Sequence, residues 1–172
     1  MSTSGAPDGA LPQAEFPHLR VLSQYVKELS FQNAMGALAG QMQDVQPAID
    51  MGVEVKSRQL GENGEATEVD LCINVQARRG ETPLFSVNLV YTGAFQFINV
   101  SPGDAEPLIW IECPRLLFPF SRQILAEVTR EGGYPPLLIN PIDFTPLYMN
   151  ELRERQEQQS DVPLGQAPVS QS

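Results

Sequence analysis

Apolar and polar residues alternate in four separate runs along the first part of the chain. The runs cover residues 19–31, 49–56, 68–76 and 84–97, and Tyr25 falls on the apolar face of the first run. Alternation with a period of two is typical of strands that bury one face. Short turn-forming sequences separate the last three runs, which favours hairpins. The pattern therefore predicts a four-stranded antiparallel sheet with one wet, acidic face and one dry face that needs a cover.

The spacing of apolar residues changes in the second half of the chain. After a turn-like segment at 101–106 and a short apolar run at 108–111, apolar residues recur every three to four positions: Leu117, Phe120, Ile124, Leu125 and Val128. This period predicts a long helix that begins near Pro114 and ends at the glycine pair 132–133. Pro119 lies inside the expected helix and predicts a kink or a late start of the regular part.

A second helix is expected to end the folded part of the chain. Asp143 is suited to cap its first turn, and apolar residues recur in it as far as Leu152. Strands first and helices last indicate an α+β architecture in one domain. We expect a disordered arm at residues 1–17, which is rich in Gly, Ala, Pro and Ser, a folded domain at 18–152, and a flexible tail at 153–172.

Charge and composition limit the classes of binding partner and the cellular compartment that we expect. The formal net charge is −10 and Lys and Arg form no cluster, so binding of nucleic acid is disfavoured. Residues 44–70 hold seven acids against Lys56 and Arg58, which is half of the net charge. This acidity is either a solvated face that keeps the protein soluble or a docking surface for a basic partner. The sequence shows no signal peptide and no apolar run that could span a membrane, so we expect a cytoplasmic protein.

Few residues could carry out chemistry. His18 is the only histidine, and a nucleophile activated by histidine would depend on it alone. Cys72 and Cys113 are interpreted as small structural residues, because neither has a basic residue directly beside it in the sequence to lower the pKa of its thiol. Motifs for zinc, calcium or phosphate binding do not occur in the sequence. The sequence therefore predicts a binding protein without catalytic residues, metal or cofactor.

Two irregular segments are more apolar than ordinary loops. Residues 33–45 contain Met35, Leu38 and Met42, and they are long for a loop between two strands. Residues 132–142 contain three prolines and the apolar side chains of Tyr134, Leu137, Leu138 and Ile139. Both segments could fold their side chains onto the sheet and helices. Alternatively, they line a groove for an extended apolar peptide, for which adaptable Met side chains are well suited.

Several sequence stretches identify a family resemblance. Residues 113–122 (CPRLLFPFSR), 133–144 (GYPPLLINPIDF) and 147–150 (LYMN) closely resemble the SecB protein-export chaperones. Residues 25–31 (YVKELSF) resemble the opening strand of that family. The likeness runs from about residue 19 to residue 152, and the stretch from Cys-Pro to Met-Asn is long enough to be specific.

The resemblance implies an assembly and an activity. The assembly is a homotetramer, a dimer of dimers, with the long helices between two sheets. The activity is that of an ATP-independent holdase, which binds unfolded precursor proteins and delivers them to the SecA motor without entering the membrane. The family's client groove lies between the two apolar segments, which gives these client-binding residues: Met35, Leu38, Met42, Trp110, Tyr134, Leu137, Leu138, Ile139 and Phe144.

The resemblance also implies a docking face for the motor, formed by acids on the exposed sheet surface together with the C-terminal tail. Glu28 matches an acidic position of that face. The chain departs from the family at Gln32, where a second acid is common, and at Ser86 and Asn88, which replace an apolar–acidic pair. The tail also lacks the strongly acidic character of some relatives. The acids expected to form this face are Glu28, Glu54, Glu68 and Asp70.

Two other functions remain open at this point. A chaperone of the same fold could serve one dedicated client in a toxin–antitoxin system, and a stable complex with a single antitoxin would favour that function. A small enzyme could use the groove as its active site, with His18 as the base. The sequence favours export but does not separate export from service to an antitoxin.

Overall fold

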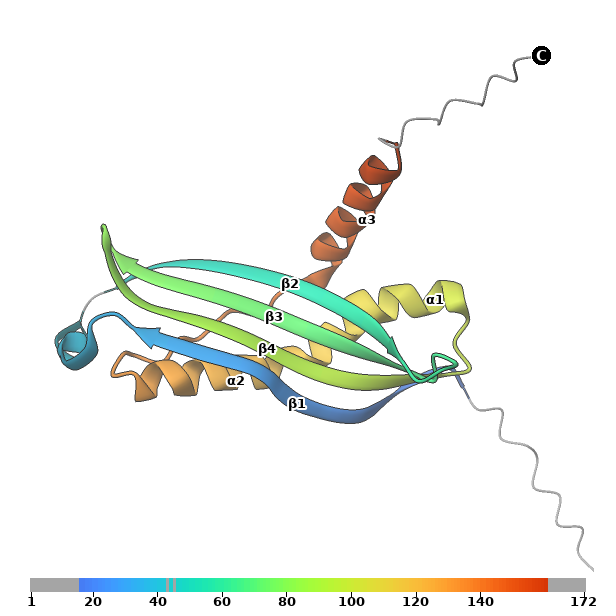
Figure 1. The fold of residues 1–172 in the computed structure, drawn as a ribbon, viewed down its shortest axis with the longest axis horizontal. Helices are drawn as coiled ribbons and strands as arrows, with labels where there is room; N and C mark the ends of the chain where they lie inside the picture. Colours follow the sequence, from blue (N-terminus) through green and yellow to red (C-terminus); the bar gives the residue numbers. More distant parts are fainter. Residues whose placement is uncertain (1–15, 43, 45, 161–172) are drawn as a thin grey trace, which may run out of the picture.

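Four long strands form one antiparallel sheet. The computed structural model describes residues 16–42, 44 and 46–160, of which Met42 and Ser160 are described for the backbone only. The strands are β1 (His18–Asn33), β2 (Ala48–Leu60), β3 (Ala66–Arg79) and β4 (Thr82–Ile98), in the spatial order β1-β4-β3-β2 (Figure 1). The predicted four-stranded antiparallel sheet is therefore confirmed, and β1 and β2 are its edges.

Helices follow the strands and cover one face of the sheet. A short helix α1 (Pro102–Pro107) and a π-helical turn η2 (Leu108–Glu112) lead into the long helix α2 (Cys113–Glu131). The chain then crosses the same face as an extended segment, residues 132–143, which we call the connector. The C-terminal helix α3 (Phe144–Ser160) points away from the sheet (Figure 1).

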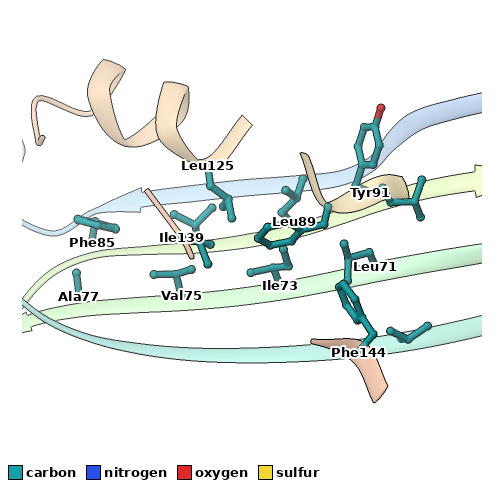
Figure 2. Packing of buried hydrophobic residues seen from close by; sticks show 14 of the residues in the cluster. Leu71, Ile73, Val75, Ala77, Phe85, Leu89, Tyr91, Leu125, Ile139 and Phe144 are labelled. Atoms are coloured by element: carbon teal, nitrogen blue, oxygen red, sulfur yellow. The ribbon is translucent and has the colours of Figure 1, made fainter. Parts of the chain in front are cut away.

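The core lies between the sheet and this helical layer. On β3, the side chains of Leu71, Ile73 and Val75 are fully or almost fully buried. Figure 2 shows these residues beneath Leu125 of α2, with Ile139 from the connector and Phe144 from the start of α3 beside them. The alternation in the sequence identified this dry face correctly, because β3 pairs on both sides and keeps a regular register with β2.

The first strand does not keep the predicted alternation. Register shifts lie between Val21 and Ser23 and between Val26 and Glu28. Each inserts one extra residue, which moves the following side chains to the other face. Tyr25 was expected on the apolar face, and this expectation is wrong: its hydroxyl donates to Glu68 on the charged face, 2.8 Å away.

The helical half also differs from the prediction at its start and its end. Residues 101–106 were expected to be turn-like, but Ser101 caps a helix there, because its side chain accepts from the Asp104 backbone N–H. Pro119 lies inside α2, which already begins at Cys113. At the other end α3 continues past Leu152 to Ser160, and Arg155 bonds to Glu151 one turn earlier. The expected arm and tail otherwise lie largely outside the described residues.

The N-cap of the last helix is confirmed. The Asp143 carboxylate accepts a hydrogen bond from the backbone N–H of Thr145 at 3.0 Å. This bond lowers the pKa of Asp143. The segment between β1 and β2 is also more regular than a loop, since residues Gly36–Met42 form a 3-10 helix, η1, in which Ala39 is buried.

Candidate functional site

An apolar pocket opens where the connector passes the beginning of β2. Its volume is about 160 Å³. Leu84 and Phe85 at the start of β4 are buried and form part of its lining. Its other lining residues come from β2 or just before it and from the connector: Pro47, Ile49, Tyr134, Pro135, Pro136, Leu137 and Leu138. We call this the connector pocket.

A second pocket lies further along the same edge of the sheet. It measures about 320 Å³ and is lined by Val53 and Val55 of β2, Trp110 of η2 and residues of α3. The guanidinium of Arg155 lies 5.0 Å from the centre of the Trp110 ring, and Arg155 also pairs with Glu106 at 2.6 Å. We call this the tryptophan pocket. The Arg155 contacts hold the C-terminal half of α3 against α1 and η2.

The dry-face side chains of β2 connect the two pockets. They are Ile49, Met51, Val53 and Val55, which pair in register with core residues of β3. Ile49 and Met51 are 38% and 42% exposed, although their β3 partners are buried. Strand residues rise about 3.3 Å each, so this row, the β2 strip, is about 20 Å long. Such a strip matches an extended peptide of several residues.

The structure divides the predicted client-binding residues into three groups. Leu38 and Leu138 are exposed, and Leu138 is exposed by 66%. Met35, Trp110 and Leu137 are partly buried against the core. Three others are almost fully buried and support the site from below: Tyr134, Ile139 and Phe144.

The predicted client-binding residues do not all lie in one pocket, and the side chain of one of them is not described. Trp110 does not join the connector residues, because it lies in the tryptophan pocket. The side chain of Met42 lies outside the described part of the chain. Ile49 and Met51 were not predicted as site residues. Their alternation marked them as core, and only the position of β2 at the edge of the sheet leaves them exposed.

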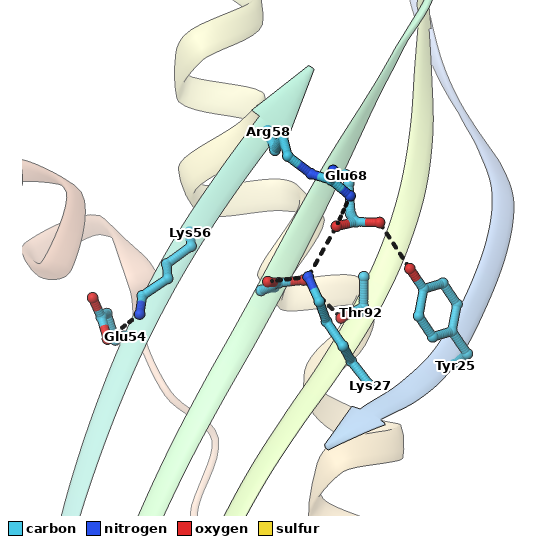
Figure 3. Close-up of polar contacts among 8 residues, drawn as sticks. Tyr25, Lys27, Glu54, Lys56, Arg58, Glu68 and Thr92 are labelled. Atoms are coloured by element: carbon cyan, nitrogen blue, oxygen red, sulfur yellow. Dashed lines mark hydrogen bonds and ion pairs between the residues drawn. The ribbon is translucent and has the colours of Figure 1, made fainter. Parts of the chain in front are cut away.

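The opposite face of the sheet carries a network of charges (Figure 3). Glu68 lies at its centre and is 6% exposed. Its carboxylate accepts hydrogen bonds from the Tyr25 hydroxyl at 2.8 Å, from Lys27 at 3.0 Å and from Arg58 at 2.8 Å. These donors, led by the Tyr25 hydroxyl, lower the pKa of Glu68 to about 2. The neighbouring Asp70 accepts from Lys27 at 2.8 Å and from the Thr92 hydroxyl at 2.7 Å.

The predicted docking acids therefore differ in their availability. Lys27 of β1 pairs with both Glu68 and Asp70, and Arg58 of β2 pairs with Glu68, so the charges of these two acids are compensated. Glu54 is exposed and pairs with the exposed Lys56 at 3.3 Å. Glu28 is exposed on β1 and faces the same side of the sheet, opposite Val90.

The departures from the family pattern lie together on this face. Gln32 pairs with Ser86 across β1 and β4, and Gln76 of β3 pairs with Ser86 on the other side. Asn88 pairs with Asn74 in the next wet-face row. A depression of about 470 Å³ opens at the same end, lined in part by Gln32, Gln76 and Ser86. This end of the face presents the amides of Gln32 and Asn88 and the hydroxyl of Ser86, where the family pattern has acids and an apolar residue.

The reactive residues are separate from the apolar site. His18 is at the opposite end of β1 from the connector pocket, and its Nδ1 lies 2.8 Å from the Phe16 carbonyl oxygen. Burial raises the pKa of Cys113 to about 12, so this thiol stays protonated near neutral pH. In the described ranges, His, Cys, Asp and Glu side chains form no group of three that could hold a metal ion. None of the described helices is long and apolar enough to cross a membrane.

Comparison with known sequences gives consistent matches over most of the chain. Residues 12–155 match the family model of the preprotein translocase subunit SecB. The chain is 46% identical over 156 residues to the protein-export protein SecB of Hyphomonas neptunium, covering 91% of this chain and 92% of that protein. It is 40% identical over 159 residues to the protein of the same name from Caulobacter vibrioides, covering 92% and 95%.

A solved structure has a similar fold. It is a SecB-like chaperone from Mycobacterium tuberculosis in complex with a peptide from an antitoxin, and it matches with a TM-score of 0.60. The match covers 73% of this chain and 91% of that chain at 11% sequence identity. At this identity the similarity supports the fold alone.

Proposed function

The chain belongs to the SecB family of protein-export chaperones, and we propose that it acts as an ATP-independent holdase. It binds unfolded precursor proteins in the cytoplasm, keeps them competent for translocation and delivers them to the SecA motor. It needs no cofactor and has no catalytic activity of its own. Binding to the unfolded state alone shifts the folding equilibrium of a precursor by mass action, so no energy source is required.

The observation that carries this proposal is the β2 strip with a pocket at each end. An extended client segment lying along it would cover Ile49 and Met51 and place apolar side chains in the connector and tryptophan pockets. The edge of β2 also offers backbone groups to an added strand, which gives affinity without sequence preference. Both properties suit a chaperone with many clients. Leu38 and Leu138 extend the apolar surface, and the buried members of the predicted set hold its shape.

We propose a dimer of dimers, as the family resemblance implies. The support is a second exposed apolar surface, on β1 and α2, separate from the β2 strip. Phe120 of α2 stacks against Tyr91 at 6.0 Å and is still half exposed. Single apolar residues on a surface are common, but this group spans a strand and the adjoining helix: Val21, Leu22, Val26, Leu29, Leu116 and Phe120. Contact with a second copy would bury it.

We propose that SecA docks on the charged face. Glu28 and Glu54 present exposed carboxylates there, whereas Glu68 and Asp70 contribute by ordering Lys27 and the surrounding strands. The folded domain is proposed to suffice for client binding without residues 1–17 or the part of the tail that follows α3. The relatives named protein-export proteins favour export over service to one antitoxin.

Light scattering tests the holdase proposal. A reduced, aggregating precursor is diluted from denaturant with and without the full chain, at a stoichiometric ratio of tetramer to precursor. The proposal expects suppression of scattering without ATP, and loss of suppression in the double variant Ile49→Ser, Met51→Ser. An unchanged scattering trace with the wild-type chain would reject it. A pull-down that returns one antitoxin instead of many precursors would replace export by the dedicated function.

A further inference from the structure

One polar cluster joins the two irregular segments that border the connector pocket. The Asn33 amide group lies at its centre, at the end of β1. Its Nδ2 donates to the carbonyl oxygen of Gly132 in the connector at 2.9 Å. Its Oδ1 accepts from the backbone N–H groups of Met35 and Gly36, at 3.2 and 2.9 Å, where the segment between β1 and β2 begins. A single side chain therefore bonds to both segments.

Tyr134 completes the cluster from the connector side. Its hydroxyl lies 2.9 Å from Asn33 Oδ1 and 2.8 Å from the carbonyl oxygen of Leu84. A phenol has one proton, so the two acceptors share it. The ring is 5% exposed and packs on Phe85 with centroids 4.8 Å apart. Leu84, Phe85 and Tyr134 all line the connector pocket, so the cluster lies directly behind its wall.

Two glycines allow the segments to approach this closely. A Cβ atom on Gly132 would lie 2.3 Å from the ring of Phe31, which is closer than any side chain could tolerate. Gly133 has a φ of +88°, and a Cβ there would lie 3.4 Å from Cβ of Ala39 in η1. The connector thus enters the site through backbone that is fitted against β1 and η1.

We propose that Asn33 and Tyr134 form a latch that fixes the connector against η1 and holds the connector pocket in its client-binding shape. This inference rests on the proposed function, because it assumes that the pocket receives client side chains. A latched connector is already ordered before the client arrives, so less conformational entropy is lost on binding. Without the latch only a fraction of molecules has the pocket formed, and apparent affinity falls by that fraction.

Loss of the latch should affect the connector pocket and not the tryptophan pocket. It acts on the connector pocket and lies far along the sheet from the tryptophan pocket, which is lined by other elements. Tyr25 supplies a matched control, because its hydroxyl also donates to a side-chain acceptor on another strand, Glu68 of β3, at 2.8 Å, but on the opposite face of the sheet. Removing that hydroxyl tests the general effect of losing a phenol hydrogen bond.

The experiment uses the full-length chain with Tyr134→Phe, Asn33→Ala, both together, and Tyr25→Phe. The probe is fluorescein-labelled α-lactalbumin, reduced and carboxymethylated so that it stays unfolded, with affinity and dissociation rate measured by anisotropy. We expect Tyr134→Phe and Asn33→Ala each to weaken binding about threefold to fivefold, since one hydrogen bond contributes about 1 kcal/mol. The double variant should bind the probe no more weakly than Asn33→Ala does, because both changes remove the same contact between Asn33 and Tyr134. Tyr25→Phe should bind as the wild type does.

Hydrogen exchange separates a latch from a local packing role. In Tyr134→Phe we expect faster exchange at the amides of Met35 and Gly36, which are bonded to Asn33 and not to the altered residue. Faster exchange confined to the connector would overturn the latch, as would wild-type affinity in both single variants. If Asn33→Ala does not fold, Tyr134→Phe decides by both measurements. A wild-type chain that fails to bind the probe would instead reject the proposed function itself.

Discussion

On the charged face of the sheet, Glu68 is a carboxylate that is 6% exposed, whereas on the helix-covered face Ile49, Met51 and Leu138 are apolar and 38–66% exposed. Charged side chains are usually exposed and apolar ones buried, and these positions show the opposite. Three donors from β1 and β2 bond to the acid, and these bonds offset the cost of its burial and link the strands. The apolar side chains lack a cover because β2 is an edge and the connector crosses only part of its face. At Glu68 the charged face is therefore satisfied by internal bonds, whereas the apolar side chains on the other face stay exposed and could be covered by the proposed client.

The largest effect should come from a residue that the family resemblance places in the client groove but that the structure buries. Phe144 is 1% exposed and packs edge-on against Phe118 at 6.3 Å. Phe144→Ala should lower the free energy of unfolding by about 4 kcal/mol, because it leaves a cavity in the core. Denaturant unfolding at fixed protein concentration measures this. Unchanged stability together with lost client binding would place Phe144 in the groove after all.

The next largest effect concerns the exposed strip. Ile49→Ser with Met51→Ser should weaken binding of an unfolded client about thirtyfold, since each removes about 1 kcal/mol of apolar contact. Stability should fall by about 1 kcal/mol for each change, because more than half of each side chain is covered in the free chain, so binding is measured where the variant is fully folded. Anisotropy with a labelled unfolded protein measures the affinity. Asp50→Ser, between them on the other face, is the control, and an equal loss there would contradict the assignment.

Glu68→Gln tests, through the pH dependence of the free energy of unfolding, how much the charge of Glu68 stabilises the fold. The pKa of Glu68 in the fold is about 2, well below its ordinary value of 4.5, and the largest cause is the hydrogen bond from the Tyr25 hydroxyl. A lowered pKa stabilises the fold fully above about pH 4.5, and this stabilisation is lost as the pH falls toward 2. We expect a loss of about 2 kcal/mol at pH 7, less than the full pKa difference because Lys27 and Arg58 are exposed.

The same variant should lose only about 0.5 kcal/mol at pH 2.5, because about a quarter of the stabilisation remains where the carboxylate is protonated in the unfolded state but still largely ionised in the folded state. Denaturant unfolding at the two pH values measures the difference. A pH-independent loss would mean that the network contributes by packing and not by charge.

The smallest effect should come from an exposed acid on the docking face. Glu28→Lys should weaken binding to SecA about threefold at low salt and less at high salt, because exposed charges are screened. Surface plasmon resonance at two salt concentrations measures it. Asp104→Lys, exposed away from the charged face, serves as the control. Equal weakening by both variants would indicate a general charge effect and would contradict a docking face at Glu28.

The sequence predicted the sheet, its dry face and the long helix because β3, β4 and α2 have regular apolar periods. It misplaced Tyr25 because two bulges in β1 leave no mark in the apolar pattern. It missed α1 because a short capped helix with Pro102 and Pro107 resembles a turn. The sequence pattern placed the end of α3 too early, at Leu152, because the last turns of this helix are polar and are held by the ion pairs of Arg155.

The candidate site was predicted in its parts but not in its arrangement. The connector was recognised because apolar residues between prolines are unusual in a loop. Exposure could not be predicted for Ile49 or Phe144, since it depends on which strand lies at the edge and where the connector crosses. The ion pairs of Glu68 and Asp70 with Lys27 could not be predicted either, because Lys27 lies on β1 and reaches these acids of β3 across β4.

Photo-crosslinking on β2 tests the central claim most directly, because neighbouring residues of one strand face opposite sides. p-Benzoylphenylalanine is placed at position 51, on the apolar strip, or at position 50, on the charged face, in the full-length chain. Each variant is irradiated with a labelled unfolded precursor. We expect strong crosslinking from position 51 and little from position 50. Crosslinking from position 50 that equals or exceeds that from position 51 would contradict it.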